Sequence, residues 1–174
     1  GRTFKESFQK AFRALEIGVE GFCDDKFLET DPERIRASLA KPSSLRAFHL
    51  RSALLAGFSP EELHELTAID PWFLQQLHEL VAMERALAAT HLPDLPAETL
   101  RAAKQMGFSD LQVARPTGPH RQPPRQRRDE LHIATTYRLV DTCAAEFEAY
   151  TPYYYSSYGA ENELHPSDRR KIMI

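Results

Sequence analysis

Two cysteines and seven histidines are the side chains here with the most obvious chemistry, and their spacing forms no familiar site. A zinc site needs ligands a few residues apart, as in CxxC or HExxH. His64 and His78 are each followed by Glu-Leu, but no second histidine follows at helical spacing. Cys23 and Cys143 lie 120 positions apart. We therefore predict no metal-binding residue, and a surface or structural role for each histidine.

Catalysis by a nucleophile, or at a bound phosphate, is not indicated either. The sequence has neither a glycine-rich phosphate loop nor a GxSxG turn. Cys143 would need a positioned histidine to act as a nucleophile, and a small buried thiol is the simpler interpretation. We predict no catalytic and no cofactor-binding residue. A small enzyme using Cys143 remains an alternative, which alkylation of the folded protein tests because an inert thiol would exclude it.

A DNA-binding helix-turn-helix is suggested by residues 57–59, Gly-Phe-Ser, between two expected helices. The second of these helices carries three glutamates between positions 61 and 65, and residues 52–84 contain no Lys or Arg. Phosphates would repel a recognition helix of that charge. We therefore expect no DNA partner.

Composition sets broader limits. The 174 residues, 42% of them hydrophobic, suffice for one domain or one domain with a tail. A net charge of −3 gives no general attraction to nucleic acid or anionic membrane, and the apolar runs are too short to span a bilayer. Two cysteines so far apart indicate a reducing compartment, which we interpret as the cytoplasm.

Helical periodicity and capping signals predict a mainly α chain. Phe4, Phe8 and Phe12 recur at helical spacing, so residues 3–16 should form an amphipathic helix. Helix starts near positions 31 and 43, and a stop at Gly57, delimit the next helices. The segments 56–59 and 106–109 repeat one stop-and-cap pattern. We therefore predict an orthogonal multi-helix domain built of two helical subunits, since a solenoid needs at least three repeats.

The most strongly specified local structure lies in residues 58–74. Ser59 is placed as a helix cap with Glu62 completing a capping box, and the flanking apolar residues occupy staple positions. Asp70 caps the next helix, expected over residues 71–89. This turn presents two aromatic side chains that we predict to anchor the packing. The candidates for packing or interface roles are Phe58, Leu63, Asp70, Pro71, Trp72 and Phe73.

Beyond residue 114 the sequence changes character. Four prolines and five arginines fall between Arg115 and Arg128, which predicts an extended or disordered linker. This stretch has no aromatic residue for base stacking; an RNA-binding tail remains an alternative that a steep salt dependence would reveal. All six tyrosines lie between positions 137 and 158, and residues 135–140 and 153–155 have strand composition. We expect a short strand-forming connector with many exposed tyrosines.

Four stretches, in order, resemble one family, the large subunit of carbamoyl-phosphate synthase. Residues 3–11 (TFKESFQKA) look like the closing helix of its first synthetase half, and residues 66–74 (LTAIDPWFL) resemble the most recognisable segment of its helical oligomerisation domain. Residues 140–153 (VDTCAAEFEAYTPY) closely resemble the connector into the second half, and residues 167–174 (SDRRKIMI) that half's first strand. The main departure is the proline-rich stretch, where relatives have a polar helix.

The resemblance implies a parent enzyme that makes carbamoyl phosphate from bicarbonate, glutamine-derived ammonia and two ATP, for arginine or pyrimidine biosynthesis. It implies that ATP and Mg²⁺ bind in the flanking synthetase halves and that no family catalytic residue falls in this segment. The implied partners are these halves, a glutaminase small subunit and further large subunits. The implied divisions are 1–18 (last helix of the first half), 19–114 (oligomerisation domain), 115–131 (linker), 132–166 (connector) and 167–174 (first strand of the second half).

A free-standing helical interaction module derived from the same domain is the main alternative. Such an adaptor would have a start codon near Gly1 and a stop codon soon after Ile174. We expect instead that the gene continues beyond both ends, and the open reading frame distinguishes the two hypotheses.

The caps and aromatics of residues 58–74 lead to a first prediction. Replacing Asp70 with alanine removes a helix cap and should lower the free energy of unfolding by about 1 kcal/mol. Replacing Trp72 with alanine should cost roughly 3–5 kcal/mol if its side chain is buried. Denaturant unfolding measures both values, and unchanged melting together with unchanged assembly would contradict the proposed anchor.

Overall fold

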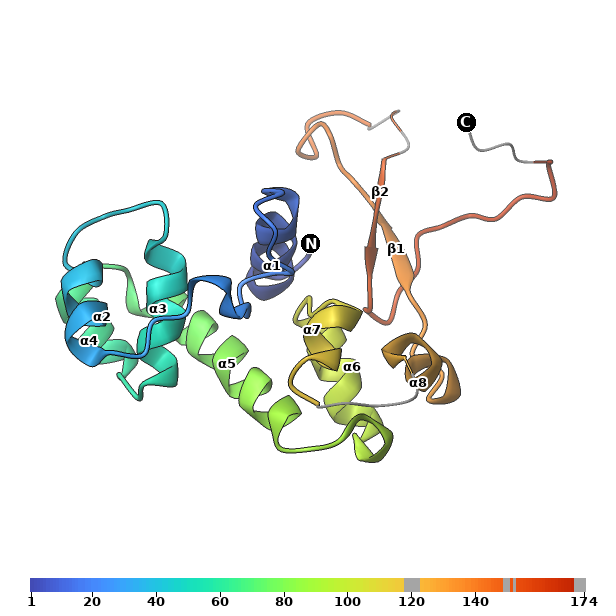
Figure 1. The fold of residues 1–174 in the computed structure, drawn as a ribbon. Coiled ribbons are helices and arrows are strands. Elements are labelled where there is room, and N and C mark those ends of the chain that lie inside the picture. Colours follow the sequence, from blue (N-terminus) through green and yellow to red (C-terminus); the bar gives the residue numbers. More distant parts are fainter. Residues whose placement is uncertain (118–122, 149–150, 152, 171–174) are drawn as a thin grey trace.

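The computed structural model describes residues 1–117, 123–148, 151 and 153–170, and this part of the chain is mainly helical as predicted (Figure 1). Its α-helices are α1 (Phe4–Ala14), α2 (Pro32–Leu39), α3 (Arg46–Leu55), α4 (Pro60–Thr67), α5 (Pro71–Ala88), α6 (Ala97–Gln105), α7 (Asp110–Ala114) and α8 (Pro124–Glu130). Two short 3₁₀ helices, η1 (Asp25–Phe27) and η2 (Leu92–Asp94), and two strands, β1 (Thr136–Leu139) and β2 (Tyr154–Ser157), complete the described structure.

The helices form two groups joined by the long helix α5. Helices α2, α3 and α4 lie toward its N-terminal end, and α6, α7 and α8 lie beyond its C-terminal end (Figure 1). Helices α1, α3 and α4 all pack against α5. The two helical subunits predicted from the repeated stop-and-cap pattern are therefore confirmed.

Side-chain caps begin α4, α5 and α7 where the sequence predicted them, whereas α3, predicted to start near position 43, begins at Arg46 with no side-chain cap. Ser59 accepts the backbone N–H of Glu62 at 3.2 Å, and the Glu62 carboxylate accepts the Ser59 N–H at 2.8 Å, so the capping box is complete. Ser109 forms a second capping box at α7, with Gln112. Asp70 accepts the backbone N–H of Trp72 at 2.8 Å. These caps satisfy N–H groups that have no partner within the helix.

Gly107 allows α1 to reach the turn between α6 and α7. The φ of Gly107 is 88°, and a Cβ at this position would lie 2.9 Å from the Cα of Glu6, closer than real Cβ contacts. The fully buried side chain of Gln9 completes this junction. Its Oε1 accepts the backbone N–H of Phe22 at 2.8 Å and the side-chain amide of Gln112 at 3.0 Å.

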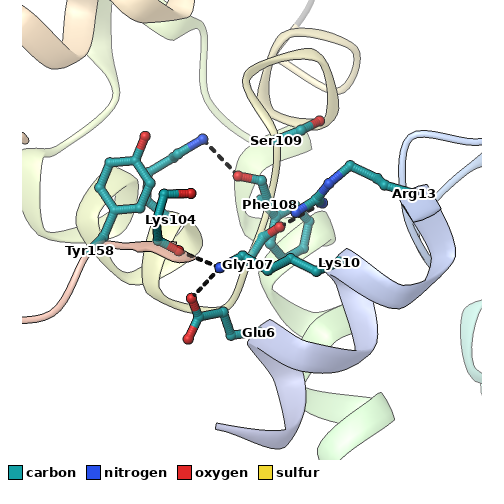
Figure 2. Close-up of a pocket in the computed structure, with 9 residues that line it drawn as sticks. Glu6, Lys10, Arg13, Lys104, Gly107, Phe108, Ser109 and Tyr158 are labelled. Carbon is teal, nitrogen blue, oxygen red and sulfur yellow. Dashed lines mark hydrogen bonds and ion pairs between the residues drawn. The ribbon is translucent and has the colours of Figure 1, made fainter. Parts of the chain in front are cut away.

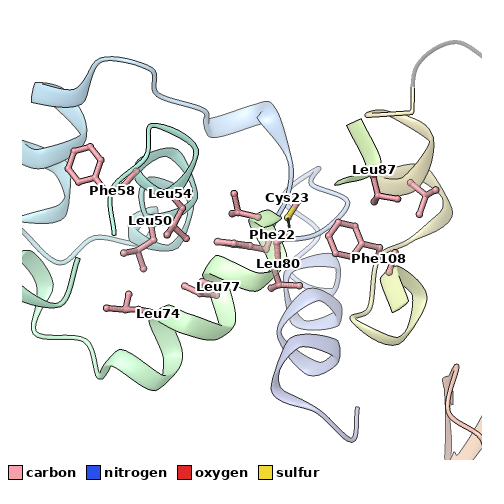
Figure 3. Packing of buried hydrophobic residues seen from close by; sticks show 14 of the residues in the cluster. Phe22, Cys23, Leu50, Leu54, Phe58, Leu74, Leu77, Leu80, Leu87 and Phe108 are labelled. Atoms are coloured by element: carbon pink, nitrogen blue, oxygen red, sulfur yellow. Dashed lines mark hydrogen bonds between the residues drawn. The ribbon is translucent and has the colours of Figure 1, made fainter. Parts of the chain in front are cut away.

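A single apolar core runs through both helical groups (Figure 3). Helix α5 supplies one continuous side of it, and the segment after α1 and the α6–α7 turn each contribute a buried phenylalanine. The fully buried large side chains are Phe22, Ile35, Leu39, Leu54, Leu63, Leu74, Leu80, Leu87, Leu92, Leu95, Leu100 and Phe108. Because the core is continuous, the two helical groups should unfold together.

The prediction of an extended linker over Arg115–Arg128 was wrong for its second part. Residues 124–130 form helix α8, with Pro124 at the first helical position, where a missing N–H costs nothing. Arg127 donates to the carbonyl of Leu95, and α8 packs against α7 and η2, so tertiary contacts stabilise the helix. Residues 118–122 lie outside the described residues.

The two predicted strands are confirmed as an antiparallel hairpin. Thr136 pairs with Ser157 and Leu139 with Tyr154. Of the strand predicted at residues 167–174, residues 167–170 are irregular and residues 171–174 lie outside the described residues, so that assignment stays a prediction. Within the described residues, no helix has the length and apolar content needed to cross a membrane.

The continuous core leads to a second prediction. Leu80 is 0% exposed in the middle of α5, so Leu80→Ala should lower the free energy of unfolding by about 2–5 kcal/mol, measured by chemical denaturation. Leu111→Ala is the matched control because Leu111 is 57% exposed on α7, and its cost should stay within about 0.5 kcal/mol. Equal costs for both variants would contradict this placement of the core.

Candidate functional site

An exposed aromatic cluster, which we call the aromatic face, joins α1 to the start of α5. It consists of Phe4, Phe8, Trp72 and Phe73. The ring of Phe4 lies 5.1 Å from that of Phe8, 5.5 Å from that of Trp72 and 5.3 Å from that of Phe73, centroid to centroid. Trp72 is 54% exposed and Phe73 is 43% exposed. Aromatic pairs at these separations fix one another's orientation, so the face is ordered as well as apolar.

An apolar groove of about 320 Å³ adjoins the aromatic face. Its walls come from α1, α3 and α5 and are almost entirely hydrocarbon. Leu50 and Leu77 belong to the buried core, whereas Phe4 and Phe73 reach the surface. The one charged lining residue, Arg46, donates to the carbonyl oxygens of Leu39 and Thr67, both at 3.1 Å. The Nε of Arg46 is buried and has no hydrogen-bond partner among the described residues. A groove with so little polar lining is suited to receiving an apolar side chain rather than to chemistry.

The structure divides the six candidate residues into two sets. Phe58 and Leu63 are buried, at 8% and 0% exposure, as expected for staple positions. Trp72 and Phe73, which were candidates for packing or interface roles, both reach solvent and lie outside the buried core, so their role as anchors stays a prediction. Successive residues of a helix are separated by about 100°, so Trp72 lies roughly 200° around α5 from the buried Leu74. Capping by Asp70 holds these aromatics outward, and the large stability cost predicted for Trp72→Ala no longer follows.

The residues first considered for chemistry are not brought together. Within the described residues, no cluster of three or more His, Cys, Asp or Glu side chains is arranged to hold a metal ion. The Cys143 thiol lies 3.8 Å from the hydroxyl of Thr142, and in the described part of the chain no histidine is hydrogen-bonded to it. Cys23 is buried, and this burial raises the pKa of its thiol well above the usual value. A protonated, buried thiol is a poor nucleophile.

A buried arginine joins η1, α3 and α5, and the sequence analysis missed it. Arg51 is 3% exposed and donates to the carbonyl of Asp24 at 2.9 Å and to the carboxylates of Asp25 at 2.7 Å and Glu84 at 3.0 Å. Burial would lower the pKa of the guanidinium, but its bonds to Glu84 and Asp25 outweigh this and raise it. Its partners lie 26 to 33 positions away, so no local pattern in the sequence could indicate them.

A second charged cluster fastens the connector to the helices. Lys104, which is 5% exposed, donates to Asp110 at 2.8 Å, and Arg128 binds the same carboxylate with two hydrogen bonds of 3.0 and 3.1 Å. The ring of Tyr158, just after β2, lies 5.0 Å from the Lys104 ammonium and 5.5 Å from the Arg128 guanidinium. At these distances each cation is attracted to the face of the ring.

The N-terminal segment contacts the same connector. Arg2 donates to the hydroxyl of Tyr155 and to the carboxylate of Glu163, both at 2.8 Å. Lys10 of α1 donates to the carbonyl of Ser156. Residues near both ends of the described chain therefore meet at one place.

Comparison with known proteins agrees with this architecture. Residues 1–132 match the family described as carbamoyl-phosphate synthetase large chain, oligomerisation domain. The chain belongs to this family. The match includes α8 and ends just before the hairpin, so the helix that replaced the predicted linker lies within the family's domain.

Curated relatives extend the similarity over the whole chain. It is 49% identical over 175 residues to the carbamoyl phosphate synthase large chain of Nostoc sp. and 50% identical over 177 residues to that of Synechocystis sp.. It is 45% identical over 179 residues to the protein of the same name from Archaeoglobus fulgidus. In each case all of this chain is covered, but only 16–17% of the relative. The chain thus corresponds to one segment of a much longer type of protein.

The charged cluster around Asp110 leads to a third prediction. Burial alone would raise the pKa of Asp110, but its bonds from Arg128 and Lys104 outweigh this and lower it. A carboxylate with a lowered folded pKa adds stability above its unfolded value of about 3.9, and this is lost as the pH falls through the folded pKa. At pH 7, Asp110→Asn should therefore cost about 1–2 kcal/mol, because the carboxylate is about one-third exposed.

Urea unfolding between neutral pH and about pH 3 measures this difference. The gap between wild type and Asp110→Asn should close on acidification, while Asp94→Asn, at an exposed aspartate of η2, should show almost no gap at any pH. A gap for Asp110→Asn that stays constant with pH would show that its carboxylate charge does not stabilise the cluster.

Proposed function

We propose that this chain is the assembly domain of a carbamoyl phosphate synthase large chain, and that it works by burying surface against neighbours without making or breaking bonds. The single observation that carries the proposal is the ordered aromatic face beside an apolar groove, on a domain of the oligomerisation family. The Trp72 side chain is 54% exposed, and leaving so large an apolar ring in water is unfavourable in free energy. Tryptophan is also among the side chains that contribute most to binding at protein interfaces.

The parent protein proposed here makes carbamoyl phosphate from bicarbonate, glutamine-derived ammonia and two ATP. Support comes from the relatives, each named carbamoyl phosphate synthase large chain, of which this chain spans about a sixth. ATP and Mg²⁺ would bind in the flanking synthetase halves, and a glutaminase subunit would be a further partner. Two unpaired cysteines, one of them buried, favour a reducing compartment such as the cytoplasm.

The occupant proposed for the aromatic face is a second copy of this chain. In a two-fold symmetric pair the same surface lies on both sides, so Trp72 of each copy can enter the apolar groove of the other. The groove adjoins the aromatic face, and both include Phe4 and Phe73. The projecting Trp72 side chain and the groove that would receive it therefore belong to one surface. Self-complementarity of this kind fits a domain family described as mediating oligomerisation.

Self-association leads to a fourth prediction. Trp72→Ala should weaken association of the 174-residue chain at least about tenfold, measured by sedimentation at several concentrations, since an aromatic anchor contributes on the order of 2 kcal/mol or more. At low concentration its free energy of unfolding should change by no more than about 1 kcal/mol, because the side chain is half exposed.

Phe147→Ala is the matched control for this experiment. Phe147 is 75% exposed in the loop between β1 and β2 and is not one of the residues of the aromatic face or of the groove, so its removal should leave association unchanged. A wild-type chain that stays monomeric, or a Trp72→Ala variant that associates as wild type does, would show that something other than a second copy covers the aromatic face.

A further inference from the structure

A small polar cavity lies between α1, the α6–α7 turn and the end of the hairpin (Figure 2). Its volume is about 160 Å³. Three cationic side chains line it, Lys10 and Arg13 from α1 and Lys104 from α6, together with one carboxylate, that of Glu6. The function proposed above uses none of these groups, and the cavity is distinct from the apolar groove.

The two lysines hold fixed positions at the cavity and each keeps a donor in reserve. Lys10 donates to the Glu6 carboxylate at 2.7 Å and to the carbonyl of Ser156. Lys104 donates to the carbonyl of Phe108 at 2.7 Å and to Asp110 at 2.8 Å. An ammonium group has three N–H donors, so each lysine has one N–H that is not hydrogen-bonded to protein. The ammonium groups of Lys10 and Lys104 also lie 5.2 and 5.0 Å from the rings of Tyr155 and Tyr158, contacts weaker than a hydrogen bond to an anion.

Arg13 is the cation whose charge is least compensated. Its Nη1 donates only to neutral oxygens, the carbonyl of Gly107 at 2.8 Å, the side-chain amide of Gln112 at 3.3 Å and the carbonyl of Glu20 at 3.5 Å. Among the described residues, no carboxylate lies within 4.0 Å of its guanidinium nitrogens. Burial lowers the pKa of Arg13, and burial likewise lowers the pKa of Lys104 despite its bond to Asp110. A bound anion would favour the charged form of both side chains and so raise both pKa values.

The charge of the cavity matches a doubly charged anion. Three cations and one carboxylate in its lining leave a net charge of two positive. Just outside, Asp110 forms ion pairs with both Lys104 and Arg128, so that Asp110 and Arg128 together leave this sum unchanged. The Glu20 carboxylate, outside the lining, also acts on the charge of Arg13. A phosphate group carries about −1.5 to −2 near neutral pH and presents three acceptor oxygens.

We propose that this cavity binds a phosphate group, with Lys10, Arg13 and Lys104 as its charged donors. The hydroxyl of Ser109 also lines the cavity; its oxygen caps Gln112 and its proton can donate. Cavities for drug-sized ligands measure roughly 300–1,000 Å³, so only the phosphoryl end of a molecule enters here. Inorganic phosphate and a small phosphomonoester share this chemistry.

Binding would join three elements that are far apart in the sequence. Lys10 and Arg13 belong to α1, Lys104 and Ser109 flank the α6–α7 turn, and Ser156 of β2 forms another wall. A phosphate bonded to the first two elements fixes Lys10, which itself holds the carbonyl of Ser156. Occupancy therefore strengthens the attachment of the hairpin to the helices that these contacts already provide.

The test is a titration of the 174-residue chain with inorganic phosphate at constant ionic strength. Binding is measured by calorimetry and by the amide NMR shifts of Gly107 and Ser109. Lys10→Gln and Arg13→Gln should each raise the dissociation constant at least about tenfold, the effect expected for one charge-assisted hydrogen bond. Arg34→Gln is the matched control, since Arg34 is 75% exposed on α2 and away from the cavity; it should change the constant less than about twofold. Phosphate should also slow hydrogen exchange of the backbone amides of residues 154–157, because it strengthens the attachment of the hairpin. This slowing should occur in wild type and in Arg34→Gln, and not in Lys10→Gln or Arg13→Gln.

Two further titrations identify the source of the phosphate group. Glycerol phosphate that binds more tightly than inorganic phosphate would indicate a phosphomonoester, and the reverse order would indicate the free ion. The proposal is overturned if no saturable change occurs by about 10 mM phosphate, ten times a dissociation constant of about 1 mM, if acetate binds as well as phosphate, or if Arg34→Gln weakens binding as much as Lys10→Gln. Lys10 is partly exposed, so Lys10→Gln should stay folded. This variant therefore tests the proposal even if Arg13→Gln unfolds.

Discussion

The close contact of α1 with the α6–α7 turn is the constraint on which most of this structure depends. Only a glycine fits at position 107, because a Cβ there would meet the backbone of Glu6. Once α1 is seated, one of its sides presents phenylalanines to α5 and to Phe22, and the other presents Lys10 and Arg13 to the cavity. The aromatic face and the proposed phosphate cavity are thus two sides of one helix, and each requires α1 in this position.

Charged residues add to the apolar contacts where small elements meet the helical body. The core holds α2 to α7 together, and η1 and the hairpin each reach apolar neighbours through one aromatic ring, Phe27 on Phe48 and Tyr158 on the core. Arg51 also joins η1 to α3 and α5, and ion pairs and cations against the ring of Tyr158 also hold the hairpin. Contacts of this type are directional and lose strength when one partner is removed. The hairpin is therefore attached by several specific polar contacts together with the packing of Tyr158, and its attachment depends on charge more than that of the helices does.

Much of the fold was predictable from local chemistry, and the site was predictable only in part. Caps such as Ser59 and Asp70 act within four residues of themselves, so the helix starts and the two helical groups followed from the sequence. Helix α8 was missed because its prolines resemble a linker, while the contacts of Arg127 and Arg128 that stabilise it lie 18 to 32 positions away. Trp72 was predicted to serve packing or an interface without a choice between the two, and the structure shows that its side chain is half exposed. The lysines and arginine of the cavity come from positions about 90 apart, a proximity that spacing along the chain does not reveal.

The hairpin docks against the N-terminal segment only after most of the chain has been synthesised. Arg2 meets Glu163 and Lys10 meets Ser156, so these contacts join residues separated by 161 and 146 positions. Non-local contacts form late because the intervening chain must first be ordered. During synthesis the helical body can therefore fold while the polar side of α1 still faces water, and the hairpin closes over it last. A nascent protein stalled before residue 154 would hold a formed aromatic face and an open cavity.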